Sequence, residues 1–281
     1  MLFRSAGRVL LATPWPWLAL AADLAFTLSV AVGIGVPLVR SGNKRNLFFI
    51  ALIAILACAN IAFHLAMRGE FAIAARDMLR LALNVIAFIM ALMAGRVVPM
   101  FTANGVPGTQ PQRLRWLEMT AMLSLIALAG ADLAQLSANF VFSIALIAAI
   151  AHAWRLALWQ PLKTAGTPIV WILHTAYAWL VIHLALRALD AAGLITPGIA
   201  VHALTVGALG GLTLGMMTRT ARGHTGRPLV AGRAEIACYV LINLAALARV
   251  ALPLLLPALQ REAVIFAGAL WTTAFLIFTL R

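Results

Sequence analysis

Apolar residues recur along the chain in stretches of about twenty, separated by short segments that hold most of the charged residues. A run of about twenty apolar residues is long enough for an α-helix to cross the hydrocarbon core of a bilayer. The pattern therefore predicts an all-α fold, a polytopic bundle of about nine transmembrane helices. We expect these helices at residues 17–39, 46–67, 74–97, 116–136, 138–159, 168–189, 197–219, 234–256 and 262–280. No connecting segment is long enough for a soluble domain, so residues 1–281 are expected to form a single integral membrane domain.

Composition supports a lipid environment. Hydrophobic residues make up 64% of the chain, charged residues only 10%, and the mean hydropathy is +1.00. Soluble domains are about half apolar and a quarter charged. The net charge of +13 comes mostly from arginine. Because these arginines lie in short loops between apolar runs, we interpret them as topology signals and expect no nucleic-acid partner.

The basic residues also predict an orientation. Assigning each of the 21 Lys and Arg residues to the nearest helix end places 13 on one side and 8 on the other. The richer side holds Arg40, the 219–233 loop and the C-terminus. Basic residues favour the cytoplasm, so the C-terminus is expected inside and, with nine spans, the N-terminus outside. Residues 1–12 are too short and interrupted to span or to form a signal peptide, and resemble the tail of an absent helix.

Five of the six histidines lie inside predicted helices and separate by depth. His64, His183 and His202 fall near the outer ends of three helices, at similar depth. Polar side chains at membrane depth normally face a bundle interior, so these imidazoles could converge on one metal site. His152 and His174 lie toward the cytoplasmic half. His174 and His183 are nine residues apart and therefore on opposite faces of one helix, which suggests separate inner and outer sites. Hydrogen bonding to a neighbouring helix is the alternative interpretation of each histidine.

Two segments are rich in glycine. The first runs from His202 through Gly207, Gly211 and Gly215 to a basic loop containing His224. Small residues four apart allow a neighbouring helix to approach closely, so we interpret these glycines as a packing surface and not as a phosphate loop.

The second segment is Gly95–Gly108. Here Pro99 is expected to break the third helix, and turns are expected at Asn104–Gly105 and at Pro107–Gly108. Arg96 lies at membrane depth, where it could meet a haem propionate or reach lipid headgroups.

Together these segments resemble the NnrS family of bacterial inner-membrane haem and copper proteins, which is associated with nitric oxide metabolism and nitrosative stress. The matching motifs are Asn60–His64, Gly95–Gly108, Trp171–Trp179 and His202–Pro228. They occur in the family's order and cover most of residues 46–228. Family members have about twelve spans, so the resemblance implies that about three N-terminal helices, including a His-Ala-His-Glu-Met type segment, are absent from this chain.

The resemblance implies haem and copper as cofactors and nitric oxide or a related small molecule as partner. It implies cofactor contacts and metal ligands among the histidines and arginines singled out above. The candidate cofactor-binding residues are His64, His174, His202, Arg96 and Arg227, and the candidate metal ligands are His64, His202, His183 and His224. Neither the haem type nor any catalytic residue can be read from the sequence. The alternatives are a small-solute transporter or channel, and a truncated remnant without function.

Overall fold

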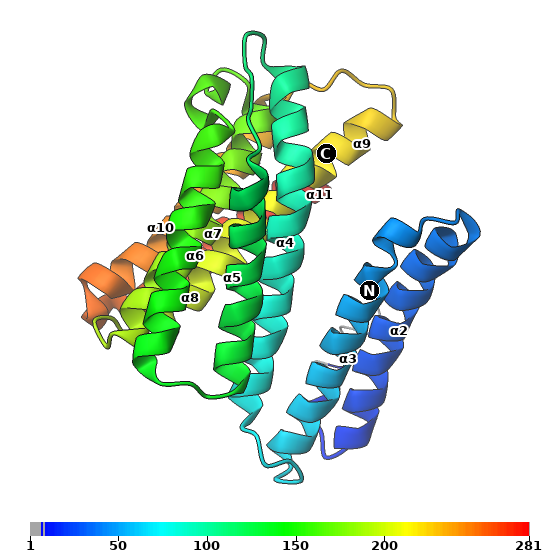
Figure 1. Cartoon of the computed structure of the whole chain (residues 1–281), viewed down its shortest axis with the longest axis vertical. Coiled ribbons are helices and arrows are strands. Elements are labelled where there is room, and N and C mark those ends of the chain that lie inside the picture. The colour runs from blue at the N-terminus through cyan, green and yellow to red at the C-terminus, as the bar shows by residue number, and fades with distance from the viewer. Residues whose placement is uncertain (1–6, 8, 281) are drawn as a thin grey trace. The chain divides into compact units, whose positions relative to one another are not determined.

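The computed structural model describes residue 7 and residues 9–280, and these residues form helices and short connections (Figure 1). Nine helical segments in this part of the chain are long and apolar enough to cross a membrane, as predicted. Eight are α2 (Pro16–Arg40), α3 (Phe48–Met67), α4 (Ala75–Gly105), α5 (Arg115–Leu133), α6 (Ala138–Leu158), α7 (Pro168–Ala191), α10 (Arg233–Leu255) and α11 (Gln260–Thr279). The ninth is continuous but mixed, and consists of α8 (Ile199–His202), a π-helix (Ala203–Leu209) and α9 (Gly210–His224).

Helix ends follow the local sequence. Pro16 and Pro168 begin α2 and α7, where the missing backbone N–H of proline costs nothing. Gly193 follows the end of α7 with a φ of 70°, a conformation that glycine adopts without strain. Helices that begin and end sharply in this way need only short connecting loops, as expected between successive membrane spans.

Three expectations about helix ends were wrong. Pro99 does not end α4, which continues to Gly105, so Asn104 and Gly105 lie within the helix and form no separate turn. Proline removes one backbone hydrogen bond, and membrane helices tolerate the loss because neighbouring helices supply other polar contacts. The seventh span continues past Arg219 to His224, so His224 ends a helix instead of lying in a loop. The predicted turn at Pro107–Gly108 is present, with Gly108 at a φ of 75°.

The chain separates into two compact units. The first comprises residues up to Ile86 together with residues 132–135, and the second comprises residues 87–131 and 136–281. In the first unit, α2 and α3 form an antiparallel hairpin (Figure 1). In the second, α7 is the central helix, and 67% of the residues in its apolar membrane-spanning stretch are buried. It packs against α6 on one side and against α8, the π-helix and α9 on the other.

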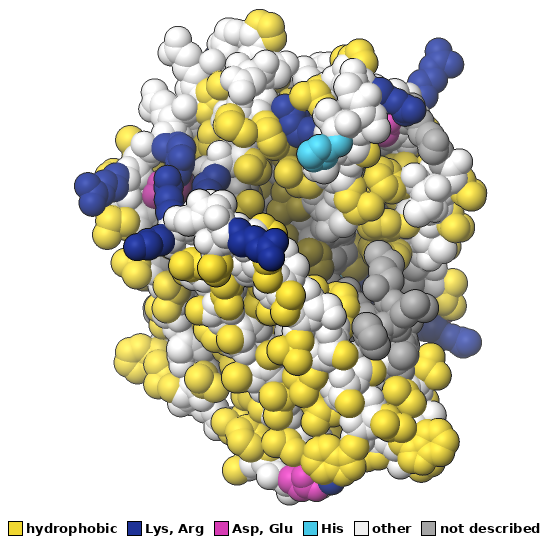
Figure 2. Space-filling model, turned by 90° about the vertical axis from the view of Figure 1, so that its right-hand side faces the viewer, with side chains coloured by type: hydrophobic (Ala, Val, Ile, Leu, Met, Phe, Trp, Pro, Cys, Tyr) yellow, Lys and Arg dark blue, Asp and Glu magenta, His cyan; other side chains and the backbone are white. Residues whose placement is uncertain are grey.

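The outer surface is that of a membrane protein. Hydrophobic side chains cover much of the face drawn in Figure 2. Large apolar residues such as Leu244, Leu247 and Phe266 are exposed on spanning helices. In a bilayer these side chains would contact lipid, so their exposure is expected and needs no protein partner.

Candidate functional site

The glycine-rich helix packs directly on α7. A Cβ added at Gly207 would overlap the indole of Trp179, and one at Gly211 would lie 2.8 Å from the Cβ of Ala176. Gly215 makes an equally close approach to Leu173. The three glycines therefore follow α7 turn by turn, and the predicted packing surface is confirmed.

The π-helix Ala203–Leu209 was not expected from the sequence. Its wider turn places Gly207 against the indole of Trp179, whose Nε1 donates to Asn243 Oδ1 on α10 at 3.0 Å. π-Helical turns are rare and occur frequently at functional sites. This one begins directly after His202, so the wide turn and a candidate ligand are adjacent.

His202 bonds to an arginine that sequence reasoning did not select. Arg249 Nη2 lies 2.6 Å from His202 Nε2. A guanidinium can only donate, so Nε2 must accept and the imidazole proton of His202 must lie on Nδ1. A metal bound through Nε2 would have to displace Arg249. An arginine inside an apolar stretch was the signal that could have drawn attention to this residue.

His183 and His174 face different helices, as their spacing predicted. His183 Nδ1 donates to the carbonyl oxygen of Ala200 in α8 at 2.7 Å. On the opposite face, His174 Nε2 lies 2.8 Å from Thr102 Oγ1 on α4. The two imidazoles therefore belong to separate sites.

The tautomer of His174 follows from its partner. The hydroxyl of Thr102 donates its hydrogen to the carbonyl oxygen of Val98 at 2.8 Å. A hydroxyl has one hydrogen, so Oγ1 accepts from His174 Nε2–H. Nδ1 then carries a lone pair. This atom is buried and, within the described part of the chain, has no hydrogen-bond partner.

His174 also lines a cavity of about 490 Å³. The other walls come from the end of α6, the short 3₁₀ turn Pro161–Thr164 and α7, and are mostly apolar. They include Leu156, Ala165, Trp171 and Ala178. An imidazole with a lone pair beside an apolar cavity is a suitable ligand for a metal or haem iron, because imidazole ligates in its neutral form.

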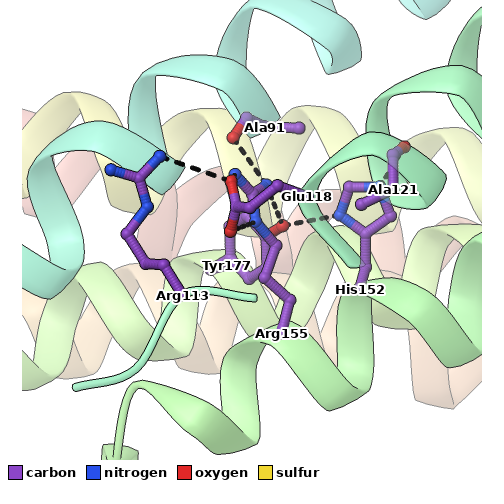
Figure 3. A network of polar contacts seen from close by, with 7 residues as sticks. All are labelled: Ala91, Arg113, Glu118, Ala121, His152, Arg155 and Tyr177. Atoms are coloured by element: carbon purple, nitrogen blue, oxygen red, sulfur yellow. Dashed lines mark hydrogen bonds and ion pairs between the residues drawn. The ribbon is translucent and has the colours of Figure 1, made fainter. Parts of the chain in front are cut away.

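A buried charge network fixes the helices around His174 (Figure 3). Arg155 on α6 donates to both carboxylate oxygens of Glu118 on α5, at 2.8 and 2.5 Å. Its Nη1 donates to Tyr177 of α7 and to the carbonyl oxygen of Ala91 on α4. The network therefore ties α4, α5, α6 and α7 together one turn from His174.

His152 ends this network. Because Tyr177 Oη accepts from Arg155, its own hydrogen goes to His152 Nδ1 at 2.5 Å. Nε2 then donates to the carbonyl oxygen of Ala121 at 3.0 Å. Both nitrogens of His152 are used, so hydrogen bonding, the alternative stated above, describes this residue. Gly95 leaves the necessary space, since a Cβ there would overlap the guanidinium of Arg155.

In the first unit, His64 pairs with an aspartate. His64 Nε2 and Asp23 Oδ2 are 3.2 Å apart, and His64 is 4% exposed. A carboxylate that orients an imidazole is common behind metal-ligating histidines. Asp23 and Asn60 line a cavity of about 410 Å³, and the buried Asn60 Oδ1 has no hydrogen-bond partner among the described residues.

The remaining candidates are Arg96, His224 and Arg227. Arg96 is half-buried on α4, and His224 is exposed at the end of α9. Arg227 is exposed and lines a cavity of about 180 Å³ together with the ion pair of Arg222 and Glu235. The described residues contain no group of three His, Cys, Asp or Glu side chains that could hold a metal ion. His64 belongs to the first unit, and His183 and His202 belong to the second. Their convergence and their roles as ligands stay predictions.

Comparison with known proteins agrees with this arrangement of motifs. The family model described as NnrS protein matches residues 1–281. The chain belongs to the NnrS family. This membership confirms the resemblance drawn from the four motifs and extends it to the whole chain. No curated protein and no solved structure matches the NnrS chain.

Proposed function

We propose that this NnrS protein binds haem and copper in the bacterial inner membrane and acts in nitric oxide metabolism or the response to nitrosative stress. Family membership supports the class of protein, as do the nine helical segments of the described residues that are long and apolar enough to cross a membrane. The observation that carries the cofactor proposal is His174, which lines an apolar cavity and whose buried Nδ1 has no hydrogen-bond partner among the described residues.

The residues around His174 are consistent with a role of this histidine as a metal ligand. Thr102 holds the imidazole in the tautomer that leaves Nδ1 unprotonated. The walls of the cavity are mostly apolar, as is common for sites that hold small molecules and cofactors. A bound haem iron or copper would supply an open coordination position for nitric oxide. Arg96 and Arg227 remain candidates for neutralising haem propionates, and His64, His202, His183 and His224 remain candidate metal ligands.

The test is an optical spectrum with iron and copper analysis on the purified 281-residue chain in detergent. We expect a haem Soret band that shifts on addition of nitric oxide. His174→Ala should lower the haem or metal content at least severalfold. Thr175→Ala is the matched control, because Thr175 lines the same cavity and its hydroxyl bonds only within α7. Equal cofactor content in both folded variants would remove His174 from the site.

A small-solute transporter is the second candidate. Its support is the cavity in the first unit, where Asp23 and Asn60 present polar oxygens within spanning helices. Transport would be favoured by two results together: the folded protein contains no haem or metal, and Asp23→Asn abolishes uptake of a solute into proteoliposomes. The continuous hydrogen-bonded π-helix, in place of an unwound segment, gives transport no further support.

A further inference from the structure

Arg249 is a cation inside a membrane helix without an acidic partner. It lies six residues before the end of α10 and is half-buried. No ion pair among the described residues includes it, and its only polar side-chain contact there is His202 Nε2. A charged side chain at membrane depth is costly and commonly marks a functional site.

The pair of Arg249 and His202 offers only donors. Arg249 uses one N–H on the imidazole and retains its others. Because Nε2 accepts, His202 Nδ1 carries a hydrogen as well. Donors with one positive charge and no acceptor select an anion.

The surrounding helices hold the pair in place. α8 is anchored by the hydrogen bond from His183 to the carbonyl oxygen of Ala200, two residues before His202. α10 is anchored by Asn243, which accepts from Trp179 of α7. The two side chains therefore meet through elements fixed on the same central helix, so the donors are arranged in advance.

A cavity lies one helical turn away. Its volume is about 390 Å³, and it is lined by the loop after α7 together with Ile199 and Pro253. Ile199 is three residues from His202, and Pro253 is four from Arg249, so each cavity residue lies one turn from its member of the pair. A small ligand could reach the pair from this side.

We propose that Arg249 and His202 bind a planar oxyanion with two oxygens on one centre, of the carboxylate or nitrite type. The guanidinium fork matches two such oxygens, and it does so better than the single charge of a lysine. The oxyanion has two possible sources: a free ion such as nitrite, or the propionate of a bound haem. The site itself does not depend on haem binding.

The first experiment is calorimetric titration of sodium nitrite into the purified chain, with sodium chloride as the ionic-strength control. We expect one nitrite per chain. Arg249→Gln should weaken binding about tenfold or more, as expected for loss of charge-assisted hydrogen bonds. Arg249→Lys should bind with intermediate affinity. Arg261→Gln, which changes an exposed arginine at the start of α11, should leave nitrite binding unchanged.

The second experiment distinguishes the sources by comparing haem with its dimethyl ester. If a propionate occupies the site, the ester will bind the unaltered chain more weakly than haem, Arg249→Gln will remove this difference, and haem will compete with nitrite. If the oxyanion is free, nitrite will bind and the ester will behave as haem does. The proposal is overturned if folded Arg249→Gln matches the unaltered chain in both nitrite and haem titrations.

Discussion

Thr102 shows how one hydroxyl can prepare a ligand. It accepts from His174 Nε2 while donating within α4, and so determines which nitrogen of the imidazole carries the lone pair. The motif Trp171–Trp179 drew attention to His174 in the sequence, whereas Thr102 is 72 residues away and could not be paired with it by spacing. The sequence could thus single out His174 as a candidate, but the orientation of its imidazole required the contact of α4 with α7.

We expect Thr102→Val to leave the imidazole N–H without an acceptor. Burial of an unsatisfied donor costs about 1–3 kcal/mol, so the variant should unfold at lower temperature in detergent. Without its hydrogen bond to Thr102, the imidazole of His174 is no longer held in one orientation. Any Soret band of a haem bound to it should therefore shift in wavelength. Thr102→Ser restores the hydroxyl and should reverse both effects. A Valine variant with unaltered melting and spectrum would show that Thr102 does not orient His174.

The buried ion pair of Glu118 and Arg155 is expected to contribute strongly to the free energy of unfolding. Arg155 is 2% exposed and Glu118 is 18% exposed. Removing one partner of a buried pair costs roughly 3–5 kcal/mol, because the remaining charge is left in a low-dielectric interior. Glu118→Ala should therefore lower the free energy of unfolding by about this amount. Glu262→Ala at the exposed start of α11 serves as control and should change it by about 0.5 kcal/mol or less.

At the level of elements, the close contact between α9 and α7 gives the sharpest test. Gly211→Leu would place a large side chain where even a Cβ comes within 2.8 Å of Ala176. Overpacking costs about 1–3 kcal/mol and should lower the melting temperature. Gly268→Leu on α11 is the matched control, since a Cβ there meets nothing within 4 Å. Equal melting of the two variants would contradict the close packing of α9 on α7.

Element boundaries show what hydrophobic pattern can and cannot predict. The nine spans follow from apolar length alone, so all were found. Pro99 was expected to end its helix, but the effect of a proline depends on polar contacts from neighbouring helices, and the sequence of one segment does not reveal these contacts. The π-helix was missed because its composition, Ala, Leu, Thr, Val and Gly, is equally compatible with an α-helix.

At the scale of the whole molecule, the orientation of the chain remains to be measured. The excess of basic residues predicts a cytoplasmic C-terminus. Green fluorescent protein fused after Thr279 should fluoresce, and alkaline phosphatase fused after Thr196, in the loop between α7 and α8, should be active. The opposite pattern would invert the topology and place Arg249 and His202 in the inner half of the membrane.

Sites built from distant segments were the least predictable feature at this scale. Equal depth suggested that His64, His183 and His202 converge, but depth defines only one coordinate of three. The structure gives each histidine a hydrogen-bond partner, namely Asp23, Ala200 and Arg249, and their convergence stays a prediction. Arg249 was treated only as one basic residue among 21, although its position inside an apolar helix distinguished it.

The π-helix sets the rotational phase between His202 and the glycines that follow it. Each residue of an α-helix advances by about 100°, so one residue more or fewer rotates everything beyond it by that angle. Deleting a single residue from Ala203–Leu209 could restore a regular helix, but His202 would then turn away from Arg249 if the glycines kept their contact with α7. A regular helix can align either His202 with Arg249 or the glycines with α7, but not both. The wide turn allows both to be aligned at once. Outside Gly207, which has no room for a side chain, the segment is therefore expected to tolerate substitutions far better than a change in its length.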